Sequence, residues 1–151
     1  MENHQTAAAF EKQLRVDIVS AERSIFSGIA KMVVVAGEEG ELGILPGHSQ
    51  LLTRIKPGEV RVVKAEGGEE MYYVSGGFLE VQPYLASILA DTVIRGTDID
   101  EERALEAKSH AEKVLSEKSK KDKEYAAALI ELTRAIAQLK IARKLHDQAK
   151  K

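Results

Sequence analysis

Four histidines and a scatter of carboxylates are the side chains of this sequence that could serve as general acids or bases. His4, His48, His110 and His146 are spread along the chain, which contains no cysteine. General-base catalysis would need a pairing such as His48 with Asp91. No nucleophile elbow, phosphate-binding glycine loop or metal-ligand spacing accompanies that pair. We therefore expect no catalytic residue and no metal site, and no enzymatic activity of the isolated chain.

Charge and composition exclude several further classes of function. The chain carries 22 Lys plus Arg against 24 Asp plus Glu, and no basic strip interleaved with aromatic residues, so we expect no nucleic-acid partner. The absence of cysteine favours a reducing compartment. Residues 1–12 are predicted to be a polar N-terminal extension without a signal sequence, and no stretch reaches the length of a membrane span.

Asp100 and Arg103 form the most suggestive charged pair, because residues three apart lie one above the other on a helix. Ala104 and Ala107 fall on the same side, toward whatever that helix packs on. An ion pair within the helix is the simplest explanation of this spacing.

The elements that must position these residues fall into two parts of the chain, which differ in their content of glycine and proline. All 11 glycines and all 3 prolines lie at or before Gly96, and residues 97–151 contain neither. Before Gly96, short β-branched and alternating runs are separated by turn signals, as in an all-β sandwich. About eight to ten strands are expected in residues 13–96, including a run buried on both faces at residues 29–36. The turns and strand boundaries are predicted at residues 37–40, at Gly67 and Gly68, and at Pro83.

Residues 97–151 are predicted to form an antiparallel hairpin of two helices. The first helix is expected at residues 99–117, with Asp98 as N-cap and Glu101 completing a capping box. The polar residues 118–123 break the pattern, and Asp122 or a neighbour caps a second helix that runs toward Ala149. The fold class is thus a mostly β N-terminal sandwich followed by an all-α C-terminal hairpin.

The second helix has two apolar faces. One stripe contains mainly leucine and isoleucine, and a second gathers around Arg134. Two explanations remain open: a helix packed on both sides in a compact fold or dimer, or a helix that changes partners. The stripe of the first helix is mostly alanine and buries little area, which favours marginal docking. The main stripe holds Tyr125, Ala128, Leu129, Leu132, Ile136 and Leu139, and the second holds Ile130, Ala137, Ile141 and Leu145.

Six segments together resemble the epsilon subunit of bacterial F-type ATP synthase. They are LRVDIVSAE near the start, GELGILPGH at 40–48, SGGFLEVQP at 75–83, LADTVIRG at 89–96, IDEERA at 99–104 and TRAIAQLKIARKL near the end. They occur in the family's order and cover nearly all of the chain after residue 12. The resemblance implies the same sandwich-and-hairpin fold and a non-catalytic subunit of the central stalk, or rotor.

The resemblance also implies partners and a location. Such subunits hold the gamma subunit and rest on the c-ring, so that rotation driven by protons or sodium ions passes through them at the cytoplasmic face of the bacterial inner membrane. Glu41, Leu42 and His48 match the loop that contacts gamma and the c-ring. From the residues alone, this segment is a turn shaped by glycine and proline, with His48 an ordinary surface histidine.

In some family members the IDEERA motif helps to bind ATP. Ile99, Asp100, Arg103 and Ala104 match that motif, and Arg134 matches an arginine of the second helix that contacts the nucleotide. His110 and Gln138 stand where stronger binders have arginine. Because neutral side chains cannot replace charge-assisted contacts to phosphate, the resemblance implies weak ATP binding, or none at cellular concentrations, and no required cofactor.

In related subunits the hairpin extends into the catalytic head, where it contacts the alpha and beta subunits and blocks ATP hydrolysis. Arg134, Lys140, Arg143 and Lys144 are the basic residues of the second helix that would make those contacts. The alternative for these charges is a solvated helix face. The alternative for the whole chain is a generic protein-binding adaptor or chaperone with no role in rotation.

Overall fold

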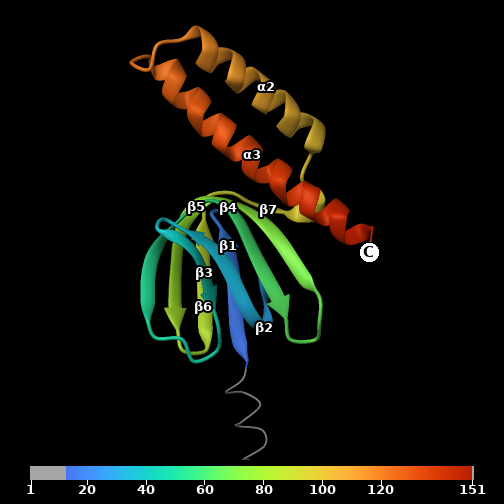
Figure 1. Ribbon diagram of the computed structural model, residues 1–151. Coiled ribbons are helices and arrows are strands. Elements are labelled where there is room, and N and C mark those ends of the chain that lie inside the picture. Colours follow the sequence, from blue (N-terminus) through green and yellow to red (C-terminus); the bar gives the residue numbers. More distant parts are fainter. Residues whose placement is uncertain (1–12, 151) are drawn as a thin grey trace, which may run out of the picture.

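The computed structural model describes residues 13–150. The polar extension predicted for residues 1–12 lies outside this range. Within it, strands come first and helices follow, as predicted from the sequence (Figure 1). The strands are β1 (Leu14–Ser20), β2 (Ser24–Gly37), β3 (Gly40–Ile44), β4 (Leu51–Lys64), β5 (Glu69–Gln82), β6 (Leu85–Ala90) and β7 (Val93–Arg95).

The strands form one sheet that closes on itself. Their order is β1-β6-β5-β4-β2-β3, and β1 also pairs with β2, while β7 extends β5. All neighbouring pairs are antiparallel except β1 and β6, which are parallel. Because the pairing of β1 with β2 closes β1, β6, β5, β4 and β2 into a ring, only the short strands β3 and β7 lie outside it.

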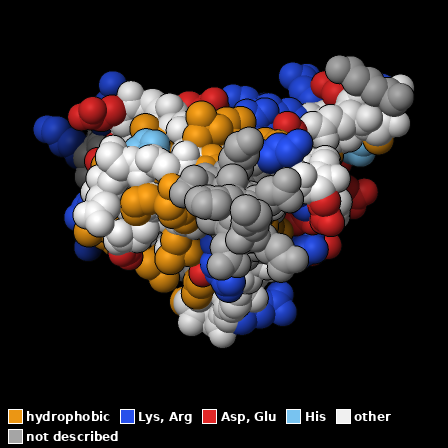
Figure 2. Space-filling model, turned by 90° about the horizontal axis from the view of Figure 1, so that it is seen from below, with side chains coloured by type: hydrophobic (Ala, Val, Ile, Leu, Met, Phe, Trp, Pro, Cys, Tyr) orange, Lys and Arg blue, Asp and Glu red, His pale blue; other side chains and the backbone are white. Residues whose placement is uncertain are grey.

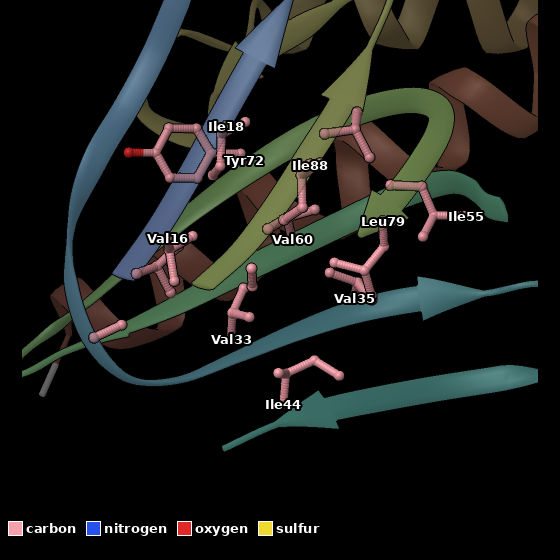
Figure 3. Packing of buried hydrophobic residues seen from close by; sticks show 14 of the residues in the cluster. Val16, Ile18, Val33, Val35, Ile44, Ile55, Val60, Tyr72, Leu79 and Ile88 are labelled. Carbon is pink, nitrogen blue, oxygen red and sulfur yellow. The ribbon is translucent and has the colours of Figure 1, made fainter. Parts of the chain in front are cut away.

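The core lies inside this closed sheet. Alternate side chains of β1 point inward, and Leu14, Val16 and Ile18 have no exposed surface. Figure 3 shows Val16 and Ile18 packing with side chains from the other strands, among them Val33, Val35 and Tyr72. Val34, on the other face of β2, is also buried, so burial on both faces is confirmed for residues 33–35, whereas Ile29 and Lys31 of the predicted run are exposed.

The number of strands is smaller than the eight to ten expected from the sequence. The reason is that Gly76 and Gly77 lie inside β5 instead of ending it. Both have positive φ angles, of 98° and 149°, which bend the strand while its ladder with β4 continues. A Cβ atom at Gly77 would lie 1.9 Å from the carbonyl oxygen of Leu89, so only glycine fits where β5 passes β6.

The helices form the predicted antiparallel hairpin. A short 3₁₀ turn, η1 (Gly96–Asp98), leads to α2 (Glu101–Glu117) and then to α3 (Lys123–Ala149). With 27 residues, α3 is about 40 Å long. Figure 1 shows the C-terminal part of α3 lying across one end of the sandwich, whereas the loop between the helices projects away from it.

The prediction that Asp98 caps the first helix is wrong. Asp98 belongs to η1, and the side chain of Asp100 accepts a 3.1 Å hydrogen bond from the backbone N–H of Arg103. Ile99, between them, packs its side chain against a buried cluster and has extended backbone angles. Because this extended residue separates η1 from α2, the helix begins two residues later than expected.

Candidate functional site

The joint between α3 and the sandwich is a small apolar cluster. Met71 and Tyr73 of β5 and Ile141 of α3 are at most 4% exposed. Ile94, Ile99, Ala137 and Leu145 surround them and are partly buried. Fully burying a side chain such as Ile141 contributes about 1.5–3 kcal/mol. With only three buried members, this cluster holds the hairpin much less firmly than the inner core holds the sheet.

Gly96 lies in the closest contact of this joint. A Cβ atom there would come within 2.8 Å of a methyl carbon of Leu145 and 2.9 Å of the backbone oxygen of Met71. Its φ angle is not in the left-handed region, so the requirement for glycine is one of space. The residue at which the composition of the chain changes is therefore also the residue over which α3 packs.

Two polar contacts flank the joint. Lys144 Nζ lies 2.6 Å from Glu59 Oε2 on β4, and His146 of α3 contacts the carboxylate of Glu101 at the start of α2. Lys144, which the resemblance assigns to partner contact, is thus engaged with the sandwich when the hairpin is docked. Lys140 and Arg143 are exposed.

The seam between α2 and α3 consists mainly of alanine. Ala104 and Ala111 on α2, and Ala128 and Ala135 on α3, are buried. Leu129 and Ile136, on the predicted main stripe of α3, remain 49% and 47% exposed. The two apolar faces of α3 therefore differ at the C-terminal half of the helix: the face with Ile141 packs there on the sandwich, although its Ile130 is 54% exposed, and the other face presents Leu129 and Ile136 to solvent.

A groove of about 930 Å³ lies between the two helices, beside the sandwich. Asp100, Arg103 and Ala104 line it from α2 and its N-cap, and Arg134 lines it from α3, so four of the five predicted nucleotide-binding residues come together. The fifth, Ile99, belongs to the apolar cluster under α3. Asp100 acts through its carboxylate on the helix N-terminus, so it is not one half of an ion pair with Arg103.

Two residues that depart from the ATP-binding pattern also have defined places. Gln138 lines the groove, and His110 Nδ1 lies 3.0 Å from Glu131 Oε1 on the opposite helix. Glu131 lines the groove as well, together with Asp98. The groove therefore contains carboxylates that the resemblance did not bring to attention.

Tyr73 is one of the three buried residues between α3 and the sandwich and is 1% exposed. Burial raises the pKa of its hydroxyl, and Arg134 and Gln138 on α3 partly oppose this. Its phenol is thus kept neutral beneath the docked helix, where an ionised oxygen would be poorly solvated.

Comparison with known protein families gives two adjoining matches. Residues 13–96 match the model described as "ATP synthase, Delta/Epsilon chain, beta-sandwich domain", and residues 97–143 match "ATP synthase, Delta/Epsilon chain, long alpha-helix domain". This chain belongs to the ATP synthase delta/epsilon family. The border between the two models falls directly after Gly96, where η1 begins to lead into the hairpin.

Solved structures share the fold of this delta/epsilon chain. A chain of the Euglena gracilis mitochondrial ATP synthase, in a structure of its OSCP, F1 and c-ring, is 21% identical with a TM-score of 0.67, covering 91% of this chain and 82% of that one. A chain from the Tetrahymena thermophila mitochondrial ATP synthase, in a structure of the central stalk and c-ring, is 14% identical with a TM-score of 0.53, covering 87% and 98%.

In the delta/epsilon chain the predicted contact loop spans β3 and the connection to β4, and that connection lies at the end of the sandwich opposite the helices (Figure 1). Glu41 is exposed on β3, Leu42 packs partly against the core, and His48 Nδ1 lies 2.7 Å from the backbone oxygen of Ser49. The Gly47 N–H donates to the Pro83 carbonyl, which joins the β3–β4 and β5–β6 connections. Figure 2 shows this end of the molecule from below, with hydrophobic side chains gathered on it.

Among residues 13–150, no helix is long and apolar enough to cross a membrane. The residues that sequence reasoning missed are Glu59 and Glu131, each of which meets a residue on another element of the delta/epsilon chain. Glu59 lies 85 positions from Lys144 in the sequence. No local pattern marks either contact, because both depend on how the helices pack.

Proposed function

We propose that this delta/epsilon chain is a rotor subunit of an F-type ATP synthase, which couples rotation of the c-ring to the catalytic head. Membership of the family and the likeness to chains found in structures of a central stalk and c-ring support this proposal. The chain has no catalytic role of its own and acts at the cytoplasmic face of a bacterial inner membrane, bound there through its partner subunits.

The sandwich supplies the fixed contacts with the gamma subunit and the c-ring. Glu41 and Leu42 lie on β3, and His48 lies in the connection after it. None of the three belongs to the apolar cluster or the ion pairs that flank it, so their contacts and those of the hairpin can change independently. A rigid closed sheet suits a part that transmits torque.

The hairpin acts as a movable brake on ATP hydrolysis. The observation that carries this proposal is the contrast between the two faces of α3: one docks through a small cluster around Ile141, and the other leaves Leu129 and Ile136 exposed. A weakly docked helix with an unused apolar face is suited to a second set of partners. Lys140 and Arg143 add positive charge for acidic segments of the alpha and beta subunits.

The groove between the helices binds ATP weakly in this proposal. Arg103 and Arg134 supply two cations from opposite helices. His110 and Gln138 supply no fixed charge, so fewer charge-assisted contacts to phosphate are available. Contacts with partner subunits, more than nucleotide, then set where the hairpin rests.

Truncation tests the brake. The chain ending at Thr97 is reassembled with the other subunits, and ATP hydrolysis is compared with that of the full chain at matched subunit occupancy. We expect faster hydrolysis by the truncated complex, and unchanged hydrolysis would refute the brake. Isolation of the tagged chain from cells tests the rotor itself: a fixed set of synthase subunits supports it, and a varied set of clients supports the adaptor alternative.

A second experiment holds the hairpin closed. The sequence contains no cysteine, so E59C and K144C introduce the only two thiols, at positions whose side chains meet when α3 is docked. A short bis-maleimide joins them. We expect the joined complex to hydrolyse ATP as fast as the truncated one, with the unjoined double variant as control.

A further inference from the structure

The groove between α2 and α3 contains two arginines whose charges are not neutralised locally. Arg103 and Arg134 line it from opposite helices. Within residues 13–150, neither has a carboxylate within 4.0 Å, whereas other basic residues of the two helices do. Guanidinium groups bind phosphate and carboxylate groups through paired hydrogen bonds. If these two arginines were its only charged residues, the groove would bind anions.

Glu131 opposes them from a central position. Its side chain lines this groove and also a neighbouring hollow of about 290 Å³, which lies toward the loop between the helices and is also lined by Val114 and Glu124. Its Oε1 lies 3.0 Å from His110 Nδ1 across the seam. Glu131 therefore lies at the border between the groove and the neighbouring hollow. His110 of the facing helix contacts its carboxylate and fixes its position.

The remaining groups of the groove do not cancel this negative charge. Asp100 is occupied as the N-cap of α2, where the helix N-terminus compensates its charge. Asp98 adds a second carboxylate, and Gln138 is neutral. A chain of phosphates that reached both arginines would bring its charges near Glu131, and like charges in a partly enclosed groove repel strongly.

We propose that Glu131, positioned by His110, determines the specificity of the groove by disfavouring polyphosphates. The inference rests on the weak nucleotide binding proposed above and names the residue that makes it weak. It differs from an explanation by missing arginines alone, because it predicts that removing one charge, without adding a cation, increases affinity.

Calorimetric titration of the full chain tests this. ATP and inorganic tripolyphosphate are titrated into the unaltered chain, E131Q, H110A and E124Q. We expect E131Q to bind both ligands about tenfold more tightly, a change in Kd measurable in a single titration series. H110A keeps the carboxylate and should show no gain. E124Q, which removes a carboxylate of the neighbouring hollow only, is the matched control.

Two further variants keep the test decisive. H110R places a cation beside Glu131 and should also increase affinity, even where E131Q loosens the hairpin. R134A in the E131Q background should abolish the gain, which locates it in this groove. Equal affinity of E131Q and the unaltered chain, including no measurable binding by either, overturns the inference even where H110R gains affinity, because H110R also supplies a missing arginine. A gain of E131Q that survives R134A overturns it as well. The rotor proposal is tested separately by hydrolysis in the reassembled complex, which none of these outcomes decides.

Discussion

Lys144 Nζ of α3 lies 2.6 Å from Glu59 Oε2 of β4, and this contact joins the hairpin to the sandwich. The Glu59 side chain is only 18% exposed, so the pair is less solvated than an ordinary surface ion pair. It can form only when α3 lies on the sheet. The same lysine that carries charge toward partner subunits in the proposed extended state is therefore neutralised by the sandwich in the docked state.

Replacing this lysine should release the hairpin. We expect K144A to weaken docking by about 1 kcal/mol, at the upper end for exposed pairs because Glu59 is left partly buried without its cation. The population of undocked hairpin should then rise about fivefold. Energy transfer between a label in the sandwich and one near Leu145 measures it. K140A removes an exposed lysine of the same helix and should leave the signal unchanged, and an equal change in both variants would contradict the role of the pair.

Gly96 should be the most sensitive position of the hinge. G96A places a methyl group within 2.8 Å of Leu145 and 2.9 Å of the Met71 carbonyl oxygen. Overpacking of this kind costs about 1–3 kcal/mol. The Leu145 methyl group can turn aside, but the Met71 oxygen is backbone, so η1, which leads into the hairpin, must shift and disturb the packing of α3. We expect faster amide exchange in the C-terminal half of α3 with the sandwich unchanged.

The control for that substitution is G43A. Gly43 is also a glycine without a left-handed φ angle, but its nearest neighbour to a new methyl group is Met32 Sδ at 3.8 Å, an ordinary contact. Unchanged exchange in G96A, or equal effects of the two substitutions, would show that the space at Gly96 does not control docking.

Docking should weaken at high pH because of Tyr73. Burial raises the pKa of this hydroxyl above its ordinary value of 10.0. The undocked state, in which the hydroxyl meets water, ionises first. The contribution of the neutral phenol to docking is therefore fully present below pH 10 and declines as the pH rises toward the raised pKa. Energy transfer between sandwich and hairpin should fall over that range, and Y73F should make the fall smaller. Y84F, at an exposed tyrosine, should not.

The sequence predicts the elements of this fold well where local pattern determines them. The alternation of Leu14, Val16 and Ile18 and the loss of glycine after Gly96 both translate directly into structure. The strand count fails at Gly76 and Gly77 because a glycine pair looks the same whether it ends a strand or bends one. The decisive fact is the approach of Leu89 from another strand, which no local pattern contains.

The candidate site is less predictable for the same reason. Asp100, Arg103 and Arg134 could be named from motifs, but Ile99 could not be assigned to the apolar cluster without knowing where α3 packs. Similarly, Glu131 is one glutamate among many on charged helices. Its importance comes from His110, 21 residues away on the facing helix. Packing of the two helices, more than composition, determines the charge of the groove.

The exposed face of α3 can be altered with little effect on the fold, so a role in partner binding can be tested separately from stability. Leu129 and Ile136 are one full heptad apart on the same side of the helix and are about half exposed, so replacing both with glutamine should change the stability of the isolated chain by no more than about 0.5 kcal/mol per site. If this face binds the catalytic head, the same double variant should lose the brake and hydrolyse ATP as fast as the truncated complex.

The matched variant for that comparison is L105Q, which removes a leucine that is 54% exposed on α2. It lies on the helix that does not pack on the sandwich and should leave hydrolysis inhibited. Thermal unfolding of each chain verifies that the fold is retained. Hydrolysis that stays inhibited in L129Q/I136Q would mean that the exposed apolar side chains of α3 contact no partner subunit. Inhibition would then depend on the basic residues of α3. The pairing of an unaffected fold with a lost brake is therefore the result that assigns this face to a partner.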